Sequence, residues 1–189
     1  MDTQPRPRCY SFPPPAGFAD ERVAWLVAGL TEVTERHFDM VQRLSTPLLD
    51  ERLGNAPSSV LQITAHLGWG DSYWLGMLRG EAIPPPDALD RERHEPPSAI
   101  PLERVIAACR KVRATGLATL REVSDPHRVL PWRGEGKLTV YGVLMHLVWH
   151  WTYHNGQCGE IALAHGHSHP WTFERHVGRV DPGGCQGEK

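Results

Sequence analysis

Residues 139–165 read TVYGVLMHLVWHWTYHNGQCGEIALAH, and this stretch decides the fold that we predict. It is long enough for roughly seven helical turns, its only formal charge is Glu160, and Gly166 ends it. A helix that is apolar or aromatic nearly all round is usually buried on more than one side. We therefore expect one side to face the core of a helical bundle. The other side would be covered by the N-terminal arm, by the loop around Trp132 or by a second subunit.

Three further helices are expected before this stretch. The first spans about 20–44, where Val23, Val27 and Leu30 keep helical spacing and Asp20 can cap the start. The second spans about 58–79, with Ser58 or Ser59 as N-cap and Gly80 at its end. The third spans about 102–123. Its basic residues are predicted to be largely solvated: Arg104, Arg110, Lys111, Arg113 and Arg121.

No alternating strand pattern and no internal repeat interrupts this series of helices. The sequence therefore predicts an all-α, four-helix bundle over residues 20–166. A Pro-rich arm over 1–19 and an irregular tail over 167–189 are expected to flank it. The long loops between helices allow a crossover connection in place of a simple up-and-down order.

Composition limits the partners of this 189-residue chain. The net charge of −2 gives no electrostatic reason to expect nucleic acid or an anionic membrane. No apolar run approaches the about 18 residues of a transmembrane helix. The cysteines are scattered and form no CxxC pair, and no signal peptide is recognisable, so we expect reduced thiols in a cytoplasmic protein.

His150 and His154 lie one turn apart on the last helix. With 11 His in the chain such a pair also arises by chance, so its position on the helix is what matters. Val143, Leu147 and Ile161 belong to the same stripe, which predicts that both imidazoles point into the bundle. Two imidazoles separated by about 6 Å of rise and 40° of rotation can bind one metal ion together.

His66 of the second helix is the expected third ligand. Three neutral imidazoles leave a coordination position open, as in catalytic zinc sites. Zn, Ni and Fe all accept such ligands, and histidines that only form hydrogen bonds in the core remain the alternative. His37 and Tyr73 are predicted to take part in proton transfer. The residues expected to bind substrate are Trp69, Tyr73 and Met77, which share a face with His66, and Trp151.

The motifs HLGWGDSYW (66–74) and HLVWHWTYHNGQCGEI (146–161) resemble those of the DinB/YfiT-like superfamily. The last helix of that family commonly reads H-x3-H-x-GQ, which His150, His154, Gly156 and Gln157 match. The resemblance implies a four-helix bundle with a divalent metal held at the positions of His66, His150 and His154. Tyr153 and Asn155 depart from the pattern, since many members carry His and Arg there.

The resemblance also implies chemistry with low-molecular-weight thiols, as in bacillithiol S-transferases and mycothiol-dependent maleylpyruvate isomerases. We therefore expect an enzyme whose metal activates such a thiol for transfer to an electrophilic small molecule, or for a thiol-assisted isomerisation or elimination. Hydrolysis by a metal-bound water is the alternative reaction, and a bundle that only binds a metal or ligand is the non-catalytic alternative. A homodimer through the last helix is also expected, because that helix carries so little charge.

Overall fold

The computed structural model describes residues 14–52, 54–55, 57–80, 89, 100–131 and 137–167. The described residues form helices and no strand, apart from one isolated bridge between Val129 and Thr139. The helices are α1 (Glu21–Val41), α2 (Thr46–Leu49), α3 (Val60–Arg79), α4 (Leu102–Arg121) and α5 (Val140–Ala164). The four long helices form the predicted bundle, and the single-turn α2 was not expected. The predicted arm and tail fall mostly outside the described residues.

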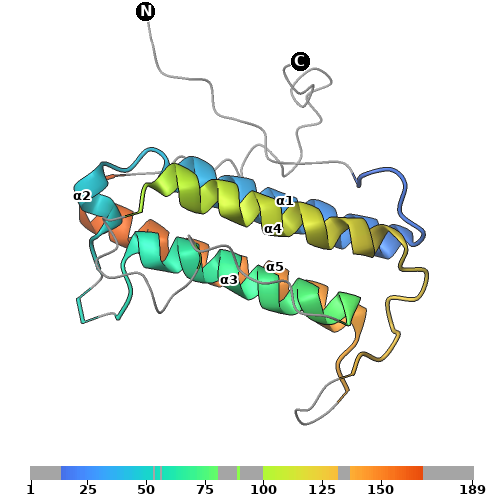
Figure 1. Ribbon diagram of the computed structural model, residues 1–189. Helices are drawn as coiled ribbons and strands as arrows, with labels where there is room; N and C mark the ends of the chain where they lie inside the picture. Colours follow the sequence, from blue (N-terminus) through green and yellow to red (C-terminus); the bar gives the residue numbers. More distant parts are fainter. Residues whose placement is uncertain are drawn as a thin grey trace, which may run out of the picture.

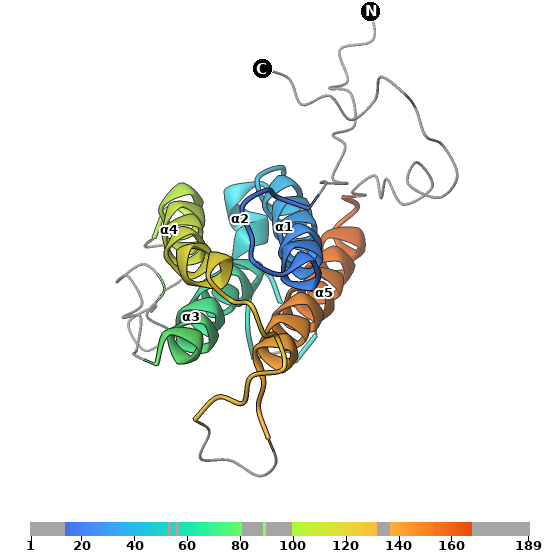
Figure 2. The ribbon, with the colours of Figure 1, turned by 90° about the vertical axis from the view of Figure 1, so that its right-hand side faces the viewer.

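The four long helices follow a crossover order (Figure 1). The closest packing is between α3 and α4 and between α1 and α5, and α5 also packs on α3. α1 and α5 run in one direction and α3 and α4 in the other, as the colours in Figure 1 and the end-on view in Figure 2 show. α3 and α5 are therefore neighbouring antiparallel helices. This pairing brings the two histidine motifs together.

Side-chain caps fix where the helices begin. The Asp20 carboxylate accepts from the backbone N–H of Arg22 and Val23 at the start of α1. Ser59 and Gln62 form a reciprocal capping box at the start of α3. Thr139 accepts from the backbone N–H of Gly142 at the start of α5. The cap at Asp20 and the alternative Ser59 are as predicted, and they set the register of the residues that follow.

Two glycines let α3 and α4 approach closely. A Cβ on Gly68 would overlap the Cys109 sulfur, and a Cβ on Gly116 would overlap the Leu75 side chain. Cys109 is 1% exposed, so its side chain is fully enclosed in this contact. This close contact holds α3 firmly against α4.

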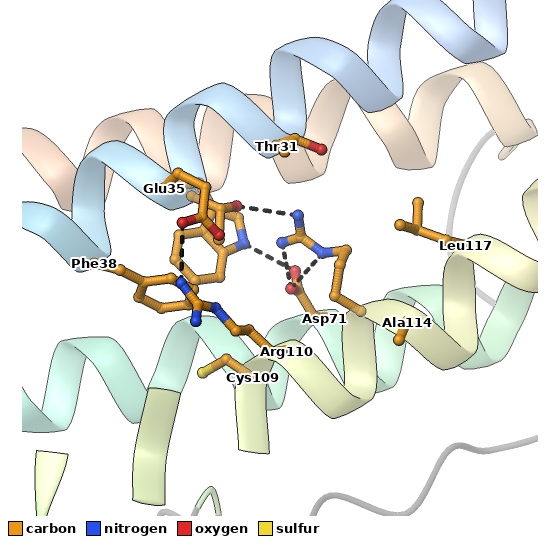
Figure 3. Close-up of a pocket in the computed structure, with 11 residues that line it drawn as sticks. Thr31, Glu35, Phe38, Asp71, Cys109, Arg110, Ala114 and Leu117 are labelled. Carbon is orange, nitrogen blue, oxygen red and sulfur yellow. Dashed lines mark hydrogen bonds and ion pairs between the residues drawn. The ribbon is translucent and has the colours of Figure 1, made fainter. Parts of the chain in front are cut away.

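A buried polar network crosses the core of the bundle (Figure 3). Asp71 of α3 accepts from the Arg113 guanidinium, with Nε to Oδ2 at 3.0 Å, and from Trp151 Nε1 at 2.9 Å. Arg113 Nη1 also donates to Thr34 Oγ1 of α1 at 3.0 Å. Arg113 is 8% exposed, so its predicted solvation is wrong: the Asp71 carboxylate holds it inside. The network joins all four long helices.

Within the described ranges, every helix is too short or too polar to span a lipid bilayer.

Candidate metal centre

Three imidazoles converge between α3 and α5. Nε2 of His66 and Nε2 of His150 lie 3.1 Å apart. One ring nitrogen from each of His66, His150 and His154 lies within 4.8 Å of the others. His150 is 8% exposed, whereas His66 and His154 are partly buried. The group that the sequence predicted as metal ligands is therefore assembled in the fold.

Gly70 makes room for the His150 ring. A Cβ on Gly70 would lie 3.0 Å from Cε1 and 3.3 Å from Nδ1 of His150. Nδ1 is buried there without a hydrogen-bond partner among the described residues. The polar interactions of the ring are thus concentrated on Nε2, the atom that faces His66.

Gln157 orients His154. His154 Nδ1 lies 2.6 Å from Gln157 Oε1, and Gln157 Nε2 donates to the Tyr153 hydroxyl at 3.1 Å. The carbonyl oxygen of Gln157 can only accept, so Nδ1 of His154 must carry the proton. This leaves the lone pair on Nε2, as metal ligation by that atom requires.

The surroundings favour neutral imidazoles. Burial lowers the pKa of His150 to about 3, and the nearby rings of His154, His66 and His146 add to this shift. Burial also lowers the pKa of His154, although its hydrogen bond with Gln157 opposes the change. Neutral imidazole is the form that binds metal ions.

The three imidazoles fit a divalent ion. Ligand bonds of about 2.05 Å at tetrahedral angles place neighbouring nitrogens about 3.3 Å apart. The 3.1 Å between His66 and His150 is close to that value, and the three nitrogens share one small volume. The cluster holds no carboxylate, so its donor set is imidazole alone. Such a set suits Zn, Ni and Fe better than Mg or Ca.

The predicted substrate-binding residues of α3 lie beside this cluster. Trp69 stacks on His66 with ring centroids 6.4 Å apart, and Tyr73 stacks on Trp69 at 6.1 Å. Tyr73 is 47% exposed, and Trp69 is partly buried. Met77 is also partly buried; it lies one turn beyond Tyr73 on the same helix, about three turns from His66.

His37 and Trp151 occupy a different place. Each has 0% exposed surface, and their rings meet edge to face at 5.5 Å. His37 Nε2 is hydrogen-bonded to Thr64 Oγ1 at 2.9 Å. In these positions neither side chain offers an exposed surface to a substrate at the cluster.

Trp151 instead lines a separate cavity between α1 and α4 (Figure 3). The cavity has a volume of about 190 Å³ and lies on the Asp71 side of the indole. At its edge Arg110 Nη2 of α4 binds Glu35 Oε2 of α1 at 3.0 Å. The ionic partners inside it, Asp71 and Arg113, already neutralise each other.

Other residues of the site were not assigned from the sequence. They are Gly70 behind His150, Gln157 behind His154, and the aromatic neighbours Trp74, Trp149 and Tyr153. The spacing of Gln157, three residues after His154, is the one signal that could have indicated its role, because such residues meet on a helix.

The low charge of α5 has a structural explanation in the described residues. One side of the helix packs on α1 and α3 and buries Leu147, Trp151 and Cys158. The other carries Trp149 and Tyr153 beside the histidines. The homodimer inferred from this helix stays a prediction.

Fold and site together define a four-helix bundle with a three-histidine centre between antiparallel helices. The sequence matches the model of the DinB superfamily over residues 19–158, and the chain belongs to that superfamily. No protein with a curated description matches it at a significant level. A solved structure, YfiT from Bacillus subtilis, aligns with a TM-score of 0.64 and 20% identity over 84% of this chain and 95% of YfiT. YfiT is described as a probable metal-dependent hydrolase with an unusual four-helix bundle topology. At that identity the likeness establishes the fold.

Proposed function

We propose that this protein is an enzyme that holds a divalent metal ion on His66, His150 and His154. Its proposed reaction is the transfer of a low-molecular-weight thiol to an electrophilic small molecule. The observation that carries the proposal is the donor set: three imidazoles with ring nitrogens within 4.8 Å of one another, without a carboxylate. A divalent ion held by these three residues would lower the pKa of a thiol that binds to it.

The reaction balances without a redox partner. The thiol sulfur attacks the electrophilic carbon, a C–S bond forms, and the leaving group departs with the electron pair of its bond to carbon. The thiol proton passes to solvent or to the leaving group. With an electrophilic double bond in place of a leaving group, the same attack followed by expulsion of the thiol isomerises the substrate.

Residues of α3 would position the electrophile. Trp69 and Tyr73 form a stacked pair next to His66, with their rings inclined by only 6°. Because Tyr73 is 47% exposed, its hydroxyl could donate a hydrogen bond to a leaving group. Met77 would extend this surface with a deformable apolar side chain.

The nucleophilic sulfur would come from the external thiol. Cys158 is 0% exposed, and burial raises its pKa to about 12. Burial also raises the pKa of the Cys109 thiol, which lies in the contact between α3 and α4. Both stay protonated near neutral pH and are poor nucleophiles. A reducing compartment such as the cytoplasm would supply the thiol and keep both cysteines free.

Hydrolysis is the second candidate, because YfiT is described as a probable metal-dependent hydrolase. A metal ion by itself lowers the pKa of a bound water, and a general base close to the cluster would favour hydrolysis further. In the part of the chain that the structure describes, the metal-type cluster contains imidazoles and no carboxylate. Thiol transfer needs no such base once the thiolate has formed, and we therefore rank it first.

Single-turnover assays separate the candidates. The protein is loaded with Zn, Ni or Fe(II) and mixed with 1-chloro-2,4-dinitrobenzene and a panel of thiols: cysteine, N-acetylcysteine, glutathione and a cysteinyl amino sugar. Conjugation that requires both metal and one thiol, and that is lost in His154→Ala, supports transfer. Metal-dependent cleavage of p-nitrophenyl acetate without any thiol, with no conjugation, refutes transfer in favour of hydrolysis. No reaction in either assay contradicts both.

A further inference from the structure

Aromatic side chains of two helices enclose the imidazole cluster. α3 contributes Trp69, Tyr73 and Trp74, and α5 contributes His146, Trp149 and Tyr153. Together with His66 and His154 they form a closed circuit in which each ring contacts the next. Its centroid separations lie between 4.5 Å (Trp74 to His146) and 6.4 Å (His66 to Trp69). We call this circuit the aromatic bowl.

His150 forms the floor of the aromatic bowl. Its ring lies 5.0 Å from His66, 5.6 Å from His146 and 4.8 Å from His154, measured between centroids. Exposure increases from floor to rim: His150 is 8% exposed, whereas Trp149 is 60% and Tyr153 52% exposed. Large aromatic residues left in water around a buried centre are typical of a binding surface.

The rim contains two stacked pairs of rings. On α3, Trp69 and Tyr73 are inclined by 6°, and on α5, Trp149 and Tyr153 are inclined by 17° at 5.6 Å. Of these rings, those of Tyr73, Trp149 and Tyr153 are exposed. Aromatic rings bind other rings by offset stacking or by edge-to-face contact, so exposed rings of this kind favour planar ligands.

Charge narrows the choice of ligand. None of the side chains in the aromatic bowl is Asp, Glu, Lys or Arg. A divalent ion at the floor would add positive charge and would repel a cationic ligand. The electron-rich faces of Trp and Tyr stack most favourably on electron-poor rings, because the quadrupoles are then complementary.

We propose that the aromatic bowl binds the ring of a planar, electron-poor aromatic compound, neutral or anionic, directly beside the imidazole cluster. Under the proposed function this compound would be the electrophile. Its binding does not depend on that function, whereas its reaction with a thiol does.

A ligand-observed NMR titration tests the proposal on the full-length protein, with and without Zn. The probe is p-nitrobenzyl alcohol, which is planar, electron-poor and inert to thiols, and its non-aromatic counterpart is cyclohexylmethanol. We expect Trp149→Ala and Tyr73→Ala each to weaken probe binding by about 2- to 12-fold, the effect of one aromatic pair. The control is Trp25→Ala: Trp25 is 56% exposed on α1, outside the aromatic bowl, and its loss should leave the Kd unchanged.

Three results would overturn the proposal. The first is that cyclohexylmethanol binds as tightly as p-nitrobenzyl alcohol, and the second is that Trp149→Ala and Tyr73→Ala bind the probe with the wild-type Kd. The third is a wild-type dimer that Trp149→Ala turns into a 21.2 kDa monomer. The last would show that a second copy covers the rim. Because the titration needs no turnover, probe binding supports the proposal even where no thiol is transferred. Conversely, thiol transfer that is equally fast to aliphatic electrophiles and insensitive to Trp149→Ala overturns the proposal and leaves the proposed function standing.

Discussion

Replacement of Gly70 by Ala is expected to weaken metal binding without removing a ligand. The new Cβ would lie 3.0 Å from Cε1 of His150. Optimal carbon–carbon contacts are about 3.5–4.0 Å, so the ring must retreat by about 0.5 Å. Metal–ligand distances tolerate only about 0.2 Å. Changes in groups that orient a ligand typically reduce metal affinity by about 10–100-fold, or about 1.4–2.7 kcal/mol, and we predict a loss in that range.

Competition with a chromophoric chelator measures the Zn affinity of this variant. Two further glycines serve as controls. Gly156→Ala, on α5 two residues after His154, meets nothing within 4 Å, so the affinity should stay unchanged while helix propensity adds up to about 1 kcal/mol of stability. Gly68→Ala meets Cys109 and should lower stability while the protein that remains folded binds Zn normally. A Zn affinity of Gly70→Ala within two-fold of wild type would refute the assignment of His150 as a ligand held against α3.

Three further substitutions test other parts of the structure. Arg113→Ala leaves the buried Asp71 carboxylate without its cation and should lower the free energy of unfolding in urea by about 3–5 kcal/mol; a loss below about 1 kcal/mol would contradict the buried pair. Gln157→Leu should weaken Zn binding by about 10–100-fold, because His154 loses the hydrogen bond that fixes its tautomer, and an unchanged affinity would argue against that role. Cys158→Ser should leave single-turnover conjugation within several-fold of wild type; conjugation that needs Cys158 but no added thiol would disprove the external nucleophile.

The metal cluster could be predicted because its signal is local. His150 and His154 share a stripe with Leu147 and Ile161. The apolar stripe of a helix indicates which of its residues face the core. The caps Asp20 and Ser59 were likewise predictable from residues next to each helix start. Helix-level patterns depend on neighbours within about four residues, and these are visible in a sequence.

Apart from Gln157, the main features that were missed depend on contacts between helices. Arg113 is basic and lies on a helix with several solvated cations, so nothing local distinguishes it; its partner Asp71 is 42 positions away. The aromatic bowl closes only because α3 and α5 are antiparallel in one register, with Trp74 against His146 and His66 against His154. The contact of Gly70 with His150 belongs to the same register, and no single-helix pattern contains it.

Elemental analysis can show whether His66, His150 and His154 hold a metal ion. The protein is purified without a histidine tag and equilibrated in turn with Zn, Ni and Fe(II). We expect one divalent ion per chain in the wild type and in His146→Ala, whose ring stacks on His150 but lies outside the cluster. We expect loss of that ion in His66→Ala, His150→Ala and His154→Ala, each confirmed as helical by circular dichroism. Full occupancy in His150→Ala or His154→Ala, or no bound ion in the wild type, would contradict the three-histidine metal site.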